Sequence, residues 1–185
     1  MTDLVGKRIL GIDPGTIVMG YGLIEIKEDK PEILHMGVVK TKGFNDHYLR
    51  LKQIFIRTKA LIEEYLPDEV ALESPFYGKD INVILKLGRV QGIVMGLALS
   101  MDIPVAEYAP LKVKQSITGM GRASKEQVAY FLMNTMKIKK LPPELDATDA
   151  LAVAVCHYLH MKNPVSKGKY NGWSDFIKKN PSRIK

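Results

Sequence analysis

Four carboxylates stand at the edges of apolar segments, where an acidic side chain needs an explanation. Asp13 ends RILGID, Glu73 ends VALE, and Asp146 and Asp149 lead into ALAVAVC. A buried carboxylate without a partner costs several kcal/mol or stays protonated. Four acids without a cysteine and histidine cluster favour a hard cation, Mg²⁺ or Mn²⁺, over zinc. The chemistry expected of such a site is two-metal phosphoryl displacement.

Two of these acids also have a purely structural interpretation. Asp13 lies in DPGT, a good turn sequence in which the aspartate accepts backbone N–H bonds and Gly15 supplies a permissive φ. Asp146 suits the start of a helix, where aspartate is a common cap. Asp149 is harder to explain in this way, because the helix after it is apolar nearly all round. The spacing of three places Asp146 and Asp149 on one helical face, where they repel each other and need a cation.

The elements that must position these acids are strands and helices in a mixed order. Three strands are expected at 8–13, 19–26 and 31–42, forming an antiparallel meander. A helix at 45–67 follows, capped by Asn45 or Asp46 and ended by Pro67. The later elements are a strand at 68–76, a helix at 81–101, a strand at 103–110, a short basic helix or loop at 110–121, and helices at 124–137 and 146–162. This order predicts a mixed α/β layer protein rather than a Rossmann domain.

For two of the expected helices, the sequence predicts which residues share one face. The apolar side of the first helix is expected to comprise Leu49, Ile54, Ile56, Ala60, Leu61 and Leu66. In the helix at 81–101, Gly88, Gly92 and Gly96 recur every four residues and leave one side bare. We expect another helix or a partner subunit to approach there, although burial on both sides within one subunit remains the alternative.

Length and composition predict a soluble intracellular protein. The chain has 185 residues and one cysteine, Cys156, which excludes an intramolecular disulfide framework and suits the reducing cytoplasm. The N-terminal residues MTDLVGKR lack the long apolar region expected of a signal peptide. No apolar run is expected to reach the ~18 residues of a membrane span, and Lys86, Arg89 and Gln91 argue against one at 81–101.

Basic residues gather in two places. The segment Lys162–Lys185 holds seven basic residues and one acid, so most of the formal net charge of +7 lies in this tail. A second cluster has only Glu126 opposing it and comprises Lys112, Lys114, Arg122, Lys125, Lys137, Lys139 and Lys140. This cluster is either a solvated surface or a site for nucleic-acid phosphates. Trp173, Phe176 and Ile177 could dock the tail on the body as one amphipathic turn.

The motifs GIDPGT…GYG, ALESPF, LKLGRVQG, VKQSITGMGRASKEQV and DATDALAVAVCH resemble the RuvC family of crossover (Holliday) junction endodeoxyribonucleases. The resemblance runs in order from about Arg8 to His160. It implies a ribonuclease-H-like fold, with a nuclease domain at 1–162 and a basic C-terminal tail at 163–185. It also implies a homodimer that uses Mg²⁺, two ions per subunit with Mn²⁺ as a substitute, to cut two opposed strands of a four-way DNA junction. The nicks would carry 5′-phosphate and 3′-hydroxyl ends, and a branch-migration helicase complex of the RuvA and RuvB type would be a partner.

The same resemblance assigns roles to individual residues. The metal-binding and catalytic acids would be Asp13, Glu73, Asp146 and Asp149. Phe76 would stack on a base at the crossover, and its neighbour Tyr77 could share or take over that role. The lysines of VKQ and ASKEQ, Lys114 and Lys125, would hold the DNA backbone. Lys112 and Arg122, which belong to the basic cluster, are also expected to contact DNA. His157, two helical turns after Asp149, is expected to serve packing rather than the site.

Two other functions remain as alternatives. A RuvC-like nuclease that processes RNA would share the fold and the first motif, but DATDAL and the VKQ block fit the junction enzymes better. A junction-binding protein that has lost catalysis is disfavoured because all four acids are present. A sugar-kinase-like ATPase shares the DPGT loop, but it needs two such domains, which 185 residues cannot supply.

Overall fold

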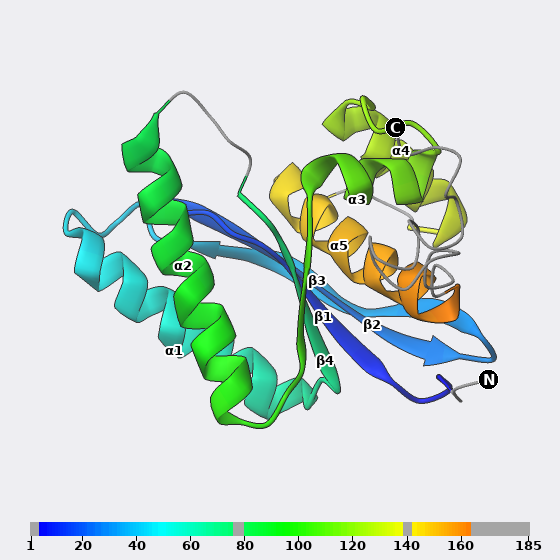
Figure 1. The fold of residues 1–185 in the computed structure, drawn as a ribbon, viewed down its shortest axis with the longest axis horizontal. Coiled ribbons are helices and arrows are strands. Elements are labelled where there is room, and N and C mark those ends of the chain that lie inside the picture. The colour runs from blue at the N-terminus through cyan, green and yellow to red at the C-terminus, as the bar shows by residue number, and fades with distance from the viewer. Residues whose placement is uncertain (1–3, 76–79, 139–141, 164–185) are drawn as a thin grey trace, which may run out of the picture.

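The fold is a five-stranded mixed sheet with helices on both faces (Figure 1). The computed structural model describes residues 4–75, 80–138 and 142–163. The strands are β1 (Arg8–Asp13), β2 (Val18–Lys27), β3 (Lys30–Lys40), β4 (Glu69–Glu73) and β5 (Val105–Tyr108). The helices are α1 (His47–Tyr65), α2 (Ile81–Ser100), α3 (Pro110–Thr118), α4 (Lys125–Thr135) and α5 (Leu145–Lys162).

The strand order β3-β2-β1-β4-β5 puts β1 at the centre of the sheet. Strands β1, β2 and β3 pair antiparallel, which confirms the predicted meander. Strands β4 and β5 are added parallel to β1, each after a crossover through helices. The carboxyl ends of β1 and β4 therefore lie at the same edge of the sheet.

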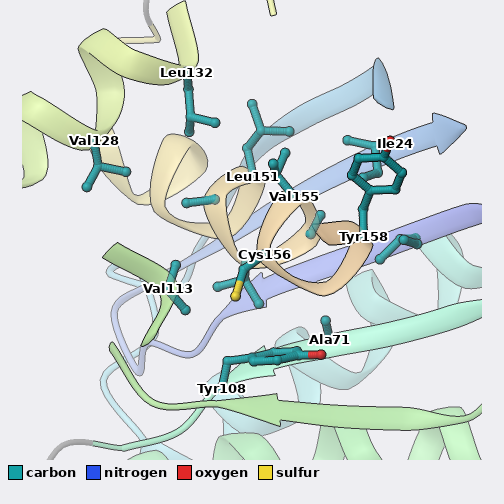
Figure 2. Packing of buried hydrophobic residues seen from close by; sticks show 14 of the residues in the cluster. Ile24, Ala71, Tyr108, Val113, Val128, Leu132, Leu151, Val155, Cys156 and Tyr158 are labelled. Carbon is teal, nitrogen blue, oxygen red and sulfur yellow. The ribbon is translucent and has the colours of Figure 1, made fainter. Parts of the chain in front are cut away.

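Each face of the sheet has its own apolar core. Helices α1 and α2 cover one face, and α3, α4 and α5 cover the other (Figure 1). In Figure 2, Leu151 and Val155 of α5 lie on the side of the helix toward Leu132 of α4, and Cys156 lies beside Val113 of α3 and above Tyr108 of β5. Helix α5 is buried over nearly its whole central length, as its unbroken apolar sequence predicts.

Capping residues fix the starts of two helices where the sequence predicts them. The Asp46 side chain accepts a hydrogen bond from the Leu49 backbone N–H at the start of α1. At the start of α4, Ser124 and Gln127 form a reciprocal capping box. Both caps satisfy backbone donors that the first helical turn leaves unpaired.

The predicted apolar side of α1 is largely wrong. Ile54 and Leu61 are buried, but Ile56 is 46 % exposed and Leu49, Ala60 and Leu66 also face solvent. The buried stripe is Ile54, Thr58, Leu61 and Ile62. This set follows the i, i+4, i+7, i+8 spacing of one helical face, whereas Ile56 lies about 200° around the helix from Ile54.

The expectation that no segment reaches the length and apolarity of a membrane span is also wrong. Among the residues described, α2 passes both criteria, and 28 % of its most apolar window is buried inside the molecule. Length and composition carry little weight here, since core helices of soluble proteins pass the same test.

Candidate metal centre

Asp13 and Glu73 approach each other because they end two neighbouring parallel strands. Ile12 of β1 pairs with Leu72 of β4, so the two acids are the next residues at the same edge. Along β1, side chains alternate between faces, and an added Cβ at Gly11 would meet Ala150 and Ala154 of α5. Asp13, two residues later, therefore faces the α5 side of the sheet.

The start of α5 comes close to this edge because the sheet lacks side chains there. Gly20 of β2 pairs with Asp13, and a Cβ at Gly20 would collide with the Asp146 carbonyl group. A Cβ at Gly22 would collide in the same way with the backbone of Leu151. Glycines in β1 and β2 thus let the α5 backbone rest directly on the sheet, which brings Asp146 and Asp149 to Asp13.

Three of the four predicted acids form a compact group. Asp13, Asp146 and Asp149 each offer a carboxylate oxygen, and these oxygens lie within 4.8 Å of one another. Among the described residues this is the group of acidic, histidine or cysteine side chains with the geometry to hold a metal ion. All three carboxylates are half-buried.

Glu73 lies beside this group rather than within it. It lines a small cavity of about 230 Å³ together with Asp13, Pro14, Leu87 and Gln91. Of the four predicted acids, three therefore have carboxylate oxygens within 4.8 Å of one another and the fourth lies in the adjoining cavity, and their role as metal ligands stays a prediction.

Gln91 is a residue of this cavity to which sequence reasoning gave no role at the site. Its side chain is buried, and its amide Nε2 donates to the Glu73 carbonyl oxygen at 2.8 Å. This bond ties α2 to the end of β4. A lone glutamine on the apolar face of a helix is the signal that could have located it, because buried amides are normally hydrogen-bonded.

Crowding of carboxylates changes their protonation. Burial, and then the charges of Glu73 and Asp149, raise the pKa of Asp13 to about 8. Burial and the charge of Asp149 raise the pKa of Glu73 to about 7. Burial also raises the pKa of Asp149, although Lys125 opposes this. The site thus concentrates more negative charge than the protein alone compensates.

Lys125 is the cation that the protein itself supplies. Its ammonium group forms an ion pair with the Asp149 carboxylate, bridging the start of α4 to the first turns of α5. Burial lowers the pKa of Lys125, but the hydrogen bond to Asp149 and the neighbouring acids raise it above the ordinary value on balance. The predicted DNA contact therefore lies within the acidic group itself.

The loop after Asp13 is held by close backbone contacts. The sequence predicts that a glycine is needed at position 15 for its permissive φ. This prediction is wrong, because the φ of Gly15 is not in the left-handed region. A Cβ at Gly15 would instead collide with the Val18 carbonyl group. The buried Thr41 hydroxyl donates to the Thr16 carbonyl oxygen at 2.7 Å and fixes the other side of the loop.

The other residues predicted at the site lie on α3, in the α3–α4 loop and on α5, or outside the described residues. Lys112, Lys114 and Arg122 lie on α3 and the α3–α4 loop, with Lys112 and Arg122 exposed and Lys114 half-buried. Phe76 and Tyr77 lie outside the described residues. His157 is buried two turns along α5, where its Nδ1 is 2.7 Å from the Tyr108 hydroxyl and its Nε2 is 2.9 Å from Glu69. These bonds agree with the predicted packing role.

The mixed sheet has a group of three carboxylates at the end of its central strand. These two features define the class of the protein, a ribonuclease-H-like protein with a candidate divalent-metal centre. The comparisons make this class more specific. A family model described as "Crossover junction endodeoxyribonuclease RuvC" matches residues 9–157. The chain is 53 % identical over 181 residues to a crossover junction endodeoxyribonuclease RuvC of Bacteroides fragilis, covering 97 % of this chain and 96 % of the relative.

Solved structures give the same result. A Thermus thermophilus RuvC structure matches with a TM-score of 0.77 and 31 % identity, covering 85 % of this chain and 96 % of that one. A T. thermophilus RuvC in complex with a Holliday junction substrate matches with a TM-score of 0.75 and 29 % identity, covering 84 % and 95 %. The chain belongs to the RuvC family of crossover junction endodeoxyribonucleases, which confirms the predicted family and fold.

Proposed function

We propose that this protein is a structure-selective endonuclease that resolves four-way DNA junctions in recombination and repair, working in the cytoplasm. It hydrolyses phosphodiester bonds by paired symmetric nicks and leaves 5′-phosphate and 3′-hydroxyl ends. Family membership supports this function. The observation that carries it is the group Asp13, Asp146 and Asp149, whose oxygens lie within 4.8 Å of one another at the end of the central strand.

The residues present fit a divalent metal ion. All the donors are carboxylate oxygens, the type that Mg²⁺ and Mn²⁺ prefer. Burial, and then the neighbouring acids, raise the pKa of Asp13 and of Glu73, and a divalent cation would favour the charged form of both carboxylates. We assign two Mg²⁺ ions per subunit, with Mn²⁺ as a substitute, held by Asp13, Glu73, Asp146 and Asp149. When bound, such ions activate a water molecule and stabilise the leaving oxygen.

The chain's own residues position the substrate around this centre. Lys125 neutralises Asp149 in the free protein, and its ammonium group is available to a DNA phosphate once Asp149 has a metal partner. Lys112, Lys114 and Arg122 bind further phosphates of the same strand. Phe76, assisted or replaced by Tyr77, stacks on a base at the crossover.

Symmetric resolution also requires a second copy of the site. Two nicks in strands of like polarity are related by the two-fold axis of the junction, and a C₂ homodimer supplies two active sites with that symmetry. We propose that the exposed glycine face of α2 forms the subunit interface. A branch-migration helicase complex of the RuvA and RuvB type is the further partner.

The test is cleavage of a four-way junction, a fork and a single-stranded RNA in the presence of Mg²⁺. Asp146→Asn should lower the rate of junction nicking by at least about 10³-fold, because metal ions supply several kcal/mol of transition-state stabilisation. Junction binding should be unchanged or tighter, since a charge that repels phosphate is removed.

Glu144→Gln is the matched control, because Glu144 lies two residues earlier and pairs with Lys40 rather than with the acidic group. It should retain nicking. Preferential cutting of the RNA would favour the RNA-processing nuclease, and junction binding by the wild-type protein without any nicking would favour the inactive binding protein.

A further inference from the structure

An apolar groove lies between the start of β3 and the helices α3, α4 and α5, and none of the acidic group lines it. Its volume is about 700 Å³. Its walls come from the start of β3, the end of α3, the end of α4 and the last turns of α5. The apolar lining residues include Ile33, Ile117, Leu132, Met136, Ile138 and Leu159. A groove of this size lies within the range of ligand pockets, about 300–1,000 Å³, and accommodates a small cluster of large side chains.

The chain leaves the body at the edge of this groove. Tyr158 lines the groove and donates its hydroxyl to the Asp29 carbonyl oxygen at 2.5 Å, in the turn between β2 and β3. One turn later, the Lys162 ammonium group pairs with the Asp29 carboxylate at 2.5 Å. These contacts fix the end of α5 against the hairpin that forms one wall. Asn163, the last described residue, is four residues beyond the lining residue Leu159.

The 22 residues that follow carry a compact set of apolar side chains in an otherwise basic and polar segment. Trp173, Phe176 and Ile177 have the i, i+3, i+4 spacing of one helical face. Ten residues separate Trp173 from Asn163, and ten extended residues span up to about 33–36 Å, so the anchor reaches every part of the groove. The family model matches residues 9–157, so this segment lies beyond the matched residues.

We propose that the groove is the docking site of this chain's own C-terminal segment, with Trp173, Phe176 and Ile177 as the anchor. Attachment at Asn163 gives the segment an effective concentration of the order of mM at the groove, which a free partner rarely reaches. Apolar burial is the attraction, because the charged groups at the groove rim, Lys30, Lys137 and Glu32, sum to +1 and do not attract a basic segment. A buried tryptophan contributes about 150–250 Å² of contact area.

The experiment uses the fluorescence of Trp173, the one tryptophan of the chain. In the full-length protein without DNA, its emission should be shifted to shorter wavelength relative to the same protein in guanidinium. Acrylamide quenching should be several-fold weaker than for a peptide of residues 164–185. Emission and quenching equal to those of the peptide would overturn the proposal.

Two variants on the last turn of α4 locate the binding site. Thr135 is exposed and lines the groove, so Thr135→Arg should obstruct it and remove most of the protection of Trp173. Asn134 is exposed on the same turn but does not line the groove, so Asn134→Arg should retain the protection. Full protection in the Thr135→Arg protein would show that the segment binds elsewhere and would overturn the assignment.

A second measurement requires no change to the groove. Trp173→Ala in the full chain should shift the methyl NMR resonances of Met136, Ile117 and Ile138 more than those of Met19 and Ile54 in the opposite core. Protection of Trp173 that is unchanged on dilution supports docking within one chain. Loss of protection on dilution would identify the segment of a second copy as the occupant and would contradict the proposal.

Discussion

At Asp13, the arrangement that suits a metal ion lowers the stability of the metal-free protein. Folding raises the pKa of Asp13 from its ordinary value of 3.8 to about 8, and it raises the pKa of Glu73 to about 7. Between about pH 4 and pH 8 the folded state therefore binds more protons than the unfolded state. The stability contributed by these protonated acids is lost as the pH rises through the folded pKa values.

Asp13→Asn should accordingly stabilise the metal-free protein at pH 8.5, by about 1–3 kcal/mol, and flatten the fall in stability between pH 5.5 and pH 8.5. Urea denaturation in the presence of EDTA measures both effects. Asp102→Asn is the control, since Asp102 is exposed at the end of α2 and should change neither quantity. A wild-type protein equally stable at both pH values would contradict the interpretation.

Lys114 tests the proposed phosphate contacts, because its ammonium group makes no ion pair among the described residues and acts on the acidic group only through its charge, which lowers the pKa values of Glu73 and Asp149. Lys114→Ala should weaken binding to junctions of every sequence alike. The slope of log K against log salt should decrease by about one unit, since one phosphate contact is removed.

Lys59→Ala on α1, on the opposite face of the sheet, is the matched control and should change neither the affinity nor the slope. Fluorescence anisotropy with several junction sequences over a range of salt concentrations measures both. A loss confined to some sequences would indicate that Lys114 reads bases.

At the scale of elements, the site depends on how closely α5 rests on β1 and β2. Gly20→Ala would place a Cβ against the Asp146 carbonyl group and push the first turn of α5 away from the sheet. We expect a loss of about 1–3 kcal/mol in the free energy of unfolding, which is typical of overpacking. We also expect weaker binding of Mn²⁺, because Asp146 and Asp149 move together with α5.

Gly43→Ala provides the comparison, since a Cβ at Gly43 meets no atom within 4 Å. Its stability should stay within about 0.5 kcal/mol of the wild type. Denaturation curves and calorimetric titration with Mn²⁺ measure the two effects. Unchanged Mn²⁺ affinity in a destabilised Gly20→Ala protein would contradict the inference that metal binding depends on the position of α5.

At the scale of the whole molecule, α2 presents an uncovered apolar face. A Cβ added at Gly88, Gly92 or Gly96 would meet nothing within 4 Å, so no part of the described chain approaches these glycines. Ile81 is 70 % exposed and Leu85 is 57 % exposed on the same helix. Burial of this face within one subunit, the alternative left open by the sequence, is therefore excluded for the described residues. An exposed apolar face of this kind is typical of a subunit interface.

Gly92→Leu should leave the monomer folded and raise the dissociation constant of the dimer at least about tenfold, equivalent to 1.4 kcal/mol. The paired nicks in a cruciform plasmid should then become uncoupled. Sedimentation velocity and the ratio of linear to nicked plasmid measure these outcomes, with Gly43→Leu as the control. A folded Gly92→Leu protein that stays dimeric and still cuts both strands together would place the interface elsewhere.

The sequence by itself determined the features that depend on neighbouring residues. Caps such as Ser124, the meander of β1 to β3 and the order of the helices follow from periodicity and turn chemistry, which a few adjacent residues encode. The acids could be named because each interrupts an apolar segment. The RuvC family was identified from five motifs in order.

Only the tertiary structure decided how distant residues meet. It separated Glu73 from the compact group of three acids, paired Lys125 with Asp149, and joined Gln91 to the end of β4. It also selected which stripe of α1 is buried. These contacts join residues far apart in the chain, and they depend on the absence of side chains at glycines such as Gly20, which lets α5 approach the sheet. Packing of whole elements sets such distances, and no local pattern of residue types encodes them.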